Sequence, residues 1–489
     1  LRLNPLQLTK DGLKGEKKGR FLVIQTFLGL GAMGYGYYLA LSVKDPVMAI
    51  MSFFLAVLLV ILGTYLLFNA GTTVVLQLLK KKKNYYYKPN NMISTSNLVF
   101  RMKKNAVGLA TIAILSSMVL VTLVGAASIY AGKKDYLASV APHDYSVTGS
   151  NVDLTSTQKI MDDFLAQSGN QVNEKAEVTY LYFGIKEQEK NKLTIFPENE
   201  RKVLPKSIFL VFSQATYKQL TGKDLNLASN QVGLFTKNKT LKDQKSLSFN
   251  GQNYQIQDDI NDFIKGKVPN IFTIIVSDYN YLVVPDMDDF KESIKGTATT
   301  QATYVGVNVK DPTHDGKKNS DLLDQMTDKE TQQLAGQTTG VSQSYLTANS
   351  QYDTEGMLNG FVGGTLFIGI FLSIIFMLGT VLVIYYKQIS EGYEDRERFV
   401  ILQKIGLDDL QVKQTIRKQV LTVFFLPLIF AFIHLAFAYH MLSLIVRIIG
   451  VFNPSLMLVV TIIVCGVFFL AYVLVFALTS RSYRRIVSM

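Results

Sequence analysis

The sequence predicts an α-helical polytopic membrane protein with six spans and a large extracellular α+β domain. Three observations predict this class. Hydrophobic residues make up 48% of the 489-residue chain, which is high for a soluble domain that carries ordinary surface charge. Six apolar runs are long enough to cross a hydrocarbon core of about 30 Å. One polar block, residues 132–355, interrupts these runs.

Six stretches without Asp, Glu, Lys or Arg predict the spans, because a charge at mid-bilayer costs roughly 2.5–3.5 kcal/mol on insertion scales. They are 21–43, 47–70, 106–131, 357–386, 419–446 and 448–478. The first stretch follows basic residues, as a secretory signal does, but it is longer than the apolar core of such a signal. A second span also follows after three residues, so we expect the first to be retained.

The chain is therefore expected to divide into nine segments. They are a cytoplasmic N-terminal segment (1–20), two spans (21–70), a basic cytoplasmic loop (71–105), a third span (106–131), the extracellular domain (132–355), a fourth span (356–386), cytoplasmic helices (387–418), two further spans (419–480) and a cytoplasmic tail (481–489).

The basic residues of the short segments predict this orientation, because Lys and Arg gather on the cytoplasmic side. Residues 1–20 carry six of them, 71–105 carry eight without an acid, and the tail carries three. Both termini are therefore expected inside and 132–355 outside. The lysine run at 80–83 is also compatible with a nucleic-acid patch, but its place directly after a span favours an anchor at the lipid headgroups, and no nucleic-acid partner is expected.

The block 132–355 is expected to be a folded α+β domain. Helical patterns occupy 155–167, with Thr155 or Ser156 as N-cap, and 320–334. The dipeptide Asn250-Gly251 predicts a hairpin turn. Alternating or β-rich runs predict strands at 177–185, 192–196, 208–212, 246–256, 271–276 and 302–309. With 24 basic and 29 acidic side chains, the block is acidic, whereas its flanks are strongly basic.

Chemical motifs do not indicate an enzyme. Gly29, Gly31 and Gly34 match G-x-G-x-x-G, but the pattern lies inside a span without a preceding strand, so close helix packing is the better interpretation. The chain has no P-loop, no G-x-S-x-G turn and no metal-ligand spacing among its four histidines. Cys465 is the single cysteine, so an intramolecular disulfide is excluded. We expect no catalytic residue, cofactor or metal.

Features inside the spans point to helix packing. Gly360 and Gly364 form G-x-x-x-G in the fourth span, which permits close contact with another helix. Pro427 removes a backbone hydrogen bond and should bend the fifth span. His434 lies near the middle of that span, where an ionisable group faces the bundle interior. It is expected either to be a neutral histidine bonded to a neighbouring helix or to couple to protons.

The cytoplasmic segment 387–418 carries seven basic and six acidic residues, too many for a simple turn. It predicts two short helices. The first, 394–405, places Phe399, Leu402 and Ile405 near one face, and Gly406 ends it. The second opens at Asp408 or Asp409. The apolar face requires a cover, which is either the membrane surface or a docked soluble partner.

These residues resemble a known family. The order of spans around one large domain, together with a motif after the fourth span, looks like an FtsX-like ABC transporter permease; the motif is Arg398-Phe399-x-x-Leu402-x-x-Ile405-Gly406. Three further motifs resemble the bacitracin export permease (Bce-type) branch. They are Asn4-Pro5-Leu6, Phe100-x-x-x-x-Asn105 and Pro427-Leu428-x-x-x-Phe432-x-His434-x-x-Phe437-Ala438. That branch has ten spans, and this chain supplies what match the last six, so a missing N-terminal half is expected.

The resemblance implies a permease in a bacterial cell membrane, of a Gram-positive organism. A cytosolic ABC ATPase dimer would push on Phe399, Leu402, Ile405 and Gly406. The substrate would be a peptide antibiotic or a lipid-linked cell-wall precursor in contact with membrane lipids, and a membrane sensor histidine kinase would read the drug load. A permease for lipids or lipoproteins, a regulator of cell-wall hydrolases and a stand-alone receptor remain as alternatives.

Overall fold

A computed structural model describes residues 19–44, 46–82, 89–200, 205, 207–270, 272, 276, 278–335, 344–404, 409–449, 451 and 453–488. The chain forms two compact units. The helical unit comprises 1–128, 366–445 and 455–489, and the β-rich unit comprises 129–365 and 446–454. Each unit is described by itself.

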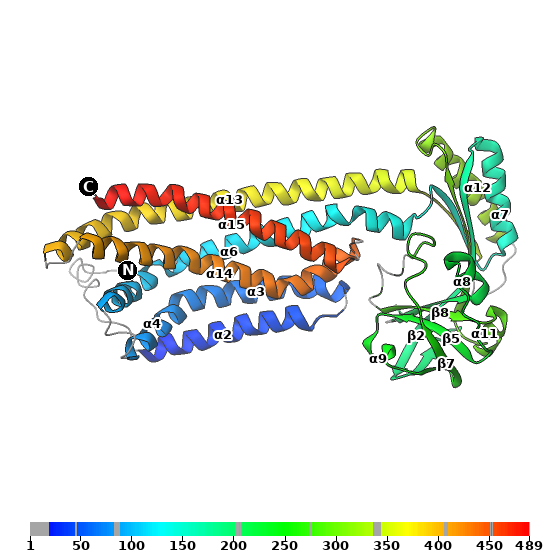
Figure 1. Cartoon of the computed structure of the whole chain (residues 1–489), viewed down its shortest axis with the longest axis horizontal. Coiled ribbons are helices and arrows are strands. Elements are labelled where there is room, and N and C mark those ends of the chain that lie inside the picture. The colour runs from blue at the N-terminus through cyan, green and yellow to red at the C-terminus, as the bar shows by residue number, and fades with distance from the viewer. Residues whose placement is uncertain are drawn as a thin grey trace, which may run out of the picture. The chain divides into compact units, whose positions relative to one another are not determined.

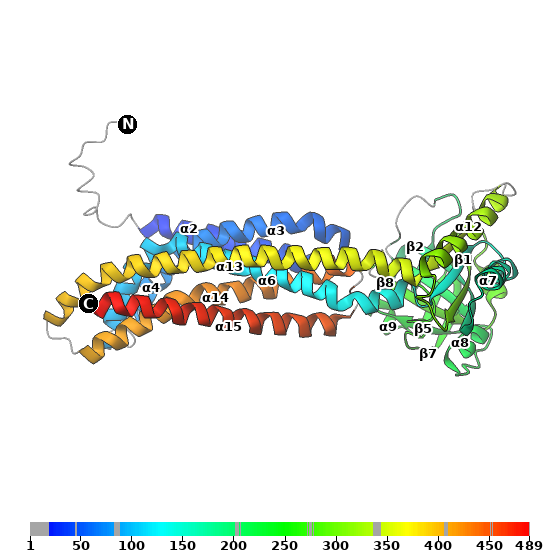
Figure 2. The same ribbon diagram turned by 90° about the horizontal axis from the view of Figure 1, so that it is seen from above.

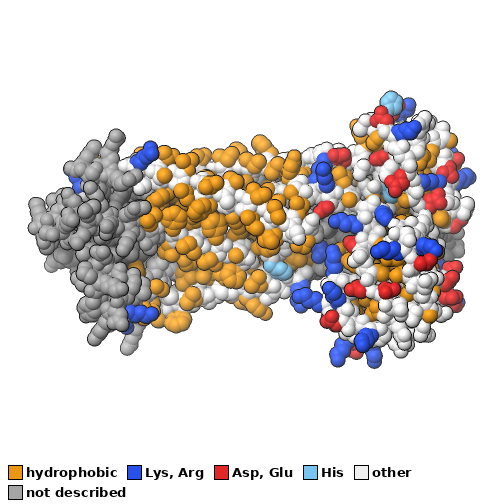
Figure 3. Space-filling model, viewed as in Figure 1, with side chains coloured by type: hydrophobic (Ala, Val, Ile, Leu, Met, Phe, Trp, Pro, Cys, Tyr) orange, Lys and Arg blue, Asp and Glu red, His pale blue; other side chains and the backbone are white. Residues whose placement is uncertain are grey.

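The helical unit consists of long helices (Figure 1). They are α2 (Gly19–Ser42), α3 (Pro46–Leu66), the π-turn η1 (Leu67–Gly71), α4 (Thr72–Lys81), α6 (Pro89–Val140), α13 (Gln351–Lys404), α14 (Asp409–Ile448) and α15 (Pro454–Ser488). Within the described residues, five stretches are long and apolar enough to span a membrane: Pro46–Leu78, Asn105–Val140, Gln351–Ser390, Phe424–Ile448 and Pro454–Arg481. Hydrophobic side chains cover this part of the surface, as lipid requires (Figure 3).

The first predicted span is a helix, α2, but it is not among the five apolar stretches, because four glycines and three tyrosines dilute its hydropathy, so its crossing of the membrane stays a prediction. One prediction about the helical unit needs correction. The segment 394–404 is not a separate short helix, because α13 continues unbroken from Gln351 to Lys404. The following helix does open at Asp409. Part of the predicted loop 71–105 is also helical, in α4 and the start of α6.

Glycines bring α2 and α3 together, and the two helices lie side by side (Figure 2). A Cβ on Gly63 would lie 2.8 Å from the Met33 backbone nitrogen, and one on Gly29 would lie 2.9 Å from the Leu66 Cβ. Gly31 and Gly34 have open space instead. Helix packing is therefore the correct interpretation for Gly29, whereas the other two glycines of that pattern take no part in it.

The β-rich unit contains a single sheet with ten strands in the described residues. They are β1 (Tyr145–Ser150), β2 (Val172–Glu189), β3 (Lys192–Ile195), β4 (Ser207–Ser213), β5 (Gln231–Thr236), β6 (Ser246–Phe249), β7 (Gln252–Asp259), β8 (Asp278–Val284), β9 (Thr299–Val309) and β10 (Tyr345–Ser350). Its helices are α7 (Leu154–Ser168), α8 (Gln214–Thr221), α9 (Lys239–Lys242), α11 (Met287–Ser293) and α12 (Gly316–Ala335).

Strands β2 to β8 close into a ring. The order is β2-β3-β6-β7-β5-β8-β4, and β4 pairs with β2 again. One apolar cluster joins side chains from these strands with others from α9 and α11, and includes Phe183, Phe209, Phe249, Leu282 and Phe290. The Phe209 and Phe249 rings meet edge to face at 5.3 Å. Closure matters because it pairs strand edges that would otherwise be open to aggregation.

The strand β2 also starts a second part of the sheet. Strands β9, β1 and β10 follow it in antiparallel order. A separate apolar cluster packs α7 and α12 against these strands, with Phe164, Met161, Val305 and Leu323 fully or almost fully buried. Asp153, rather than Thr155 or Ser156, caps α7, because its carboxylate accepts from the Ser156 backbone amide.

The predicted α+β class of this block is confirmed, and so are most of its elements. Asn250 and Gly251 have φ of 47° and 94° and join β6 to β7 as a hairpin. The strand predicted at 271–276 lies mostly outside the described residues, and the next described strand is β8, which begins at Asp278. The sequence patterns also missed β1, β5 and β10, which are six residues long each.

The ring core predicts a large stability effect for Phe209→Ala, because Phe209 is fully buried against two aromatic rings. We expect the free energy of unfolding to fall by about 3–5 kcal/mol. Val172→Ala is the control, since Val172 is 40% exposed on the same sheet. Thermal unfolding of the purified chain checks this, and equal shifts for both variants would contradict a ring core centred on Phe209.

Candidate functional site

The predicted ATPase-coupling residues lie where α13 ends and α14 begins. Phe399 and Leu402 belong to the last turns of α13, although their side chains lie outside the described residues. Ile405 and Gly406 lie wholly outside the described residues, between the two helices. Their role in coupling therefore stays a prediction.

The close contact between α13 and α6 is made by residues that sequence patterns did not single out. A Cβ on Gly369 would lie 2.4 Å from the Ala126 Cβ, so only glycine fits there. The Thr122 and Ser373 hydroxyls are 2.9 Å apart. Lys387 extends this seam, because its Nζ donates to the Asn105 carbonyl at 2.8 Å. Small residues therefore bring these two helices together.

Gly360 and Gly364, the predicted packing pair, have no described atom within 4 Å of where a Cβ would lie. Gly356 and Gly363 on the same helix are equally open. Among the described residues, no helix of this chain uses the G-x-x-x-G face. Its contact with another helix stays a prediction.

Pro427 lies inside α14, as expected. The ring has no N–H, so the Val423 carbonyl four residues earlier has no helical donor, and the ring crowds the turn that also holds the Phe424 carbonyl. The Tyr472 hydroxyl of α15 donates to the Phe424 carbonyl at 2.8 Å, three residues before the proline. Tyr472 is almost fully buried. A neighbouring helix thus supplies a donor at the opened turn, which sequence reasoning missed.

His434 connects three helices. Its Nδ1 is 2.6 Å from the Tyr37 hydroxyl of α2, and its Nε2 is 3.1 Å from the Thr64 hydroxyl of α3. The Thr64 hydroxyl donates to the Val60 carbonyl at 2.6 Å, so it accepts from Nε2–H. Tyr37 then donates to Nδ1. A neutral imidazole satisfies the whole chain of hydrogen bonds, which favours the neutral alternative over proton coupling.

A second polar contact also joins α14 to the α2–α3 pair. The His440 Nε2 donates to the Val43 carbonyl at the end of α2, at 2.8 Å. Between the two histidines, Phe437 stacks on Tyr37 with ring centres 3.9 Å apart. The α2–α3 pair is therefore bound to α14 by polar contacts at two levels, with an aromatic pair between them.

In the β-rich unit, residues at the end of α6 and the start of α13, and those that join these helices to the sheet, are bonded to each other. Lys133 and Glu355 form an ion pair at 2.6 Å. The Gln351 backbone amide donates to the Asp144 carbonyl at 2.9 Å, and the Asn349 side chain donates to the Val140 carbonyl at 3.1 Å. The entry and exit of the chain are thus tied together.

His143 lies beside this connection and is buried. Its Nδ1 is 2.8 Å from the Tyr304 hydroxyl, and burial lowers the pKa of His143, so the ring is expected to be neutral near pH 7. Gly306 makes room for it, because a Cβ there would lie 2.6 Å from Nδ1.

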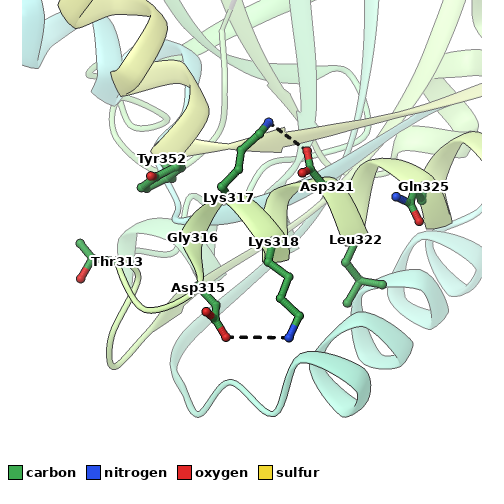
Figure 4. A pocket seen from close by; sticks show the side chains of 9 residues that line it. All are labelled: Thr313, Asp315, Gly316, Lys317, Lys318, Asp321, Leu322, Gln325 and Tyr352. Carbon is green, nitrogen blue, oxygen red and sulfur yellow. Dashed lines mark ion pairs between the residues drawn. The ribbon is translucent and has the colours of Figure 1, made fainter.

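A wide hollow of about 680 Å³ lies at the start of α12 (Figure 4). Its lysines are already paired: Lys317 contacts Asp321 at 2.9 Å, and Lys318 lies 4.0 Å from Asp315. Tyr352 forms part of its wall. Open to solvent and neutralised by its own acids, this hollow lacks the convergent unpaired groups of a ligand site.

The hydrogen bond at Pro427 gives a testable prediction. Tyr472→Phe removes the donor to the Phe424 carbonyl and should cost about 1 kcal/mol of stability. The cost should shrink in a Pro427→Ala background, where the restored backbone N–H lets the turn close. Thermal unfolding of the four variants in detergent measures the coupling. Tyr65→Phe, which loses a bond to Thr111 instead, is the control, and equal costs in both backgrounds would contradict the proposed role.

No family model matches the sequence. The chain is 25% identical over 450 residues to the ABC transporter permease protein YxdM of Bacillus subtilis (strain 168), covering 90% of this chain and 65% of the relative. It is 22% identical over 454 residues to the bacitracin export permease protein BceB of the same organism, covering 88% and 64%. It is also 22% identical over 501 residues to the ABC transporter permease YvcS, covering 99% and 72%.

The chain thus spans about two thirds of the length of these relatives, and the matches include both the helical and the β-rich unit. With five apolar helices of spanning length in the described residues, it is a multi-pass membrane protein with an extramembrane domain. It is a homologue of Bacillus ABC transporter permeases, one of which is a bacitracin export permease.

Proposed function

We propose that this chain is the membrane subunit of an ABC transporter that acts in resistance to, and sensing of, peptide antibiotics of the bacitracin class. A separate cytosolic ATPase dimer would supply the energy, and a membrane histidine kinase would read the drug load. The observation that carries the proposal is the match along 90% of the chain to an ABC transporter permease, together with the bacitracin exporter among the relatives.

The course of α13 supports coupling between ATPase and extramembrane domain. This helix begins directly after β10 of the β-rich unit, includes the candidate span Gln351–Ser390 and continues unbroken to Lys404. An unbroken helix moves as a stiff rod, so a push near Phe399 would reach its other end. The residues 405–408, between α13 and α14, would face the ATPase.

The orientation follows from charge. The basic segments 1–20 and 71–105 would lie in the cytoplasm, and the acidic block 132–355 would lie outside. An acidic outer surface would attract a cationic peptide before contact and raise its rate of capture. The spans are free of acidic and basic residues over most of their length, which supports recognition outside the membrane rather than passage through a charged pore.

Thiol labelling tests this orientation, starting from a Cys465→Ser background. A cysteine at Lys242, exposed on α9, should react with an impermeant reagent in whole cells, whereas one at Lys82 should react only after lysis. Asn238 is a poorer reporter, because its side chain caps α9 and contacts Asp278. Reversed labelling would place the β-rich unit in the cytoplasm and refute the layout.

The coupling role is tested in the complete transporter. Phe399→Asp puts a charge into an apolar contact, so co-purification of the ATPase and drug resistance should both be lost while the protein still inserts. Tyr393→Asp is the control, since Tyr393 is exposed on another face of α13. Docking through Phe399 would be refuted by retained assembly and resistance in the Phe399 variant.

A further inference from the structure

The β-rich unit contains a small cavity surrounded by charged and phenolic side chains. Its volume is about 60 Å³, compared with roughly 30 Å³ for one water in the liquid. A group of a few heavy atoms fits, but a whole drug molecule does not. The residues used below are Lys237, Asp262, Lys265, Tyr279 and Tyr281.

Lys237 follows β5 and is exposed at the rim of the cavity. Its Nζ donates to the Tyr279 hydroxyl and lies 4.7 Å from the centre of that ring. It forms no ion pair within the described part of the chain. Burial of the amino end lowers the pKa of Lys237, and the nearby positive charges of Arg447 and Lys265 act in the same direction. The Asp262 carboxylate acts in the opposite direction. The hydrogen-bond partner of the ammonium is a neutral phenol, and two of its three charged neighbours are cations, which favours an anionic ligand.

Asp262 is the acid of the cavity. Its Oδ1 is buried and has no hydrogen-bond partner among the described residues. Burial raises the pKa of Asp262, so this carboxyl accepts a proton more readily than a solvated one. The groups that face it are Lys237, Lys265 and the Tyr281 hydroxyl. A protonated Asp262 could donate to a ligand oxygen, which would satisfy the buried oxygen without repelling an anion.

The cavity lies where two candidate spans end, within one compact unit. Ser139, one residue before the end of the span Asn105–Val140, lines it, and its carbonyl accepts from the Asn270 amide at 2.8 Å. The Lys265 Nζ is 3.8 Å from the Oδ1 of Asp135, which lies on α6 as Ser139 does. Arg447 is in the last turn of α14, whose span ends at Ile448. Because that span has 25 residues, close to the length that crosses a bilayer, its end marks the depth of the lipid headgroups, whereas Asn105–Val140, with 36 residues, is longer than the bilayer requires.

We propose that this cavity is a binding site for the phosphate group of a membrane lipid. Three cations, Lys237, Lys265 and Arg447, exceed the two acids, Asp262 and Asp135. Lysine ammonium groups bind phosphate oxygens as point charges. Lys237 and Lys265 donate to the phosphate, and Asp262 takes up one proton from solvent and donates it in a hydrogen bond. A free phosphate ion has the same chemistry, but the position of Arg447 at the end of a span favours a headgroup.

This site bears on the proposed function in one respect, because a lipid-linked cell-wall precursor also carries phosphate. Only the identification of the bound lipid as the substrate of the transporter rests on that proposed function. Binding itself needs neither ATPase nor antibiotic. Failure of the transport hypothesis therefore leaves the site testable, and failure of the site leaves the transport hypothesis untouched.

The experiment uses the purified full chain in maltoside micelles, which contain no phosphate. Dihexanoyl phosphatidylglycerol is the lipid probe, because its phosphodiester keeps one charge across the pH range, and inorganic phosphate at fixed pH is the soluble probe. Calorimetric titration should show tighter binding of the lipid probe. Lys237→Met should weaken it roughly tenfold or more, as expected for a charged hydrogen bond, whereas Lys242→Met, exposed on α9, should not.

Asp262→Asn distinguishes an effect on binding from a folding defect. The variant should bind the lipid probe more tightly, whereas a misfolded protein would bind it more weakly. The substitution removes the negative charge, so the lipid probe should bind more tightly at pH 7 than to the parent chain. In the parent chain affinity should rise as pH falls through the raised pKa of Asp262, and in the variant this dependence should disappear.

Two results would overturn the proposal. If both Lys237→Met and Asp262→Asn leave the affinity for the lipid probe unchanged, the cavity is not the binding site. If inorganic phosphate binds as tightly as the lipid probe and responds to the same variants, the ligand is a soluble anion rather than a lipid headgroup.

Discussion

Lipid offers no partner for a backbone N–H or C=O, and the helical unit depends on this constraint. Long unbroken helices satisfy it, and α14 departs from it at Pro427. At that turn the Tyr472 hydroxyl of α15 reaches the Phe424 carbonyl. Other polar side chains of the bundle are also bonded: His434 has a partner at both ring nitrogens, and hydroxyls such as Thr64 donate to their own helix. The buried side chains of Ser116 and Gln388 have no partner among the described residues. The packing of α2, α3, α14 and α15 follows from where these donors lie.

The need to pair backbone N–H and C=O groups also shapes the β-rich unit. Seven strands close on themselves through the β2–β4 pairing, so the ring has no open edge. The remaining part ends at β10, where the Thr331 hydroxyl of α12 accepts from the Leu346 amide at 3.1 Å and so covers part of the edge. Asp262 is one of several exceptions in this unit, because its buried Oδ1, like the Asp278 Oδ1 and the Ser350 hydroxyl, has no partner among the described residues. What distinguishes Asp262 is that it lines the small cavity together with Lys237 and Lys265.

Local patterns predicted what depends on local physics. The length of the apolar runs indicated the five stretches of spanning length in the described residues. The dipeptide Asn250-Gly251 indicated its hairpin, because these two residue types readily adopt the positive φ that the turn requires. Pairings far apart in sequence left no such signal. Short strands such as β5 look like loops until β7 and β8 flank them. Likewise, His434 and Pro427 were visible as unusual residues in a span, but Tyr37, Thr64 and Tyr472 were not, since an aromatic or hydroxyl side chain is ordinary there.

The pairing of β1 has a consequence for biogenesis. Its six residues, Tyr145–Ser150, bond to β9 on one side and β10 on the other, so Tyr145 pairs with Val307 and with Ser350. The chain that precedes β10 must therefore be synthesised before this part of the sheet can form. During that interval the backbone groups of β1 are unpaired and can bond to wrong partners. The domain should be slow to mature and should rely on chaperones at the membrane surface while ribosomes complete its last third.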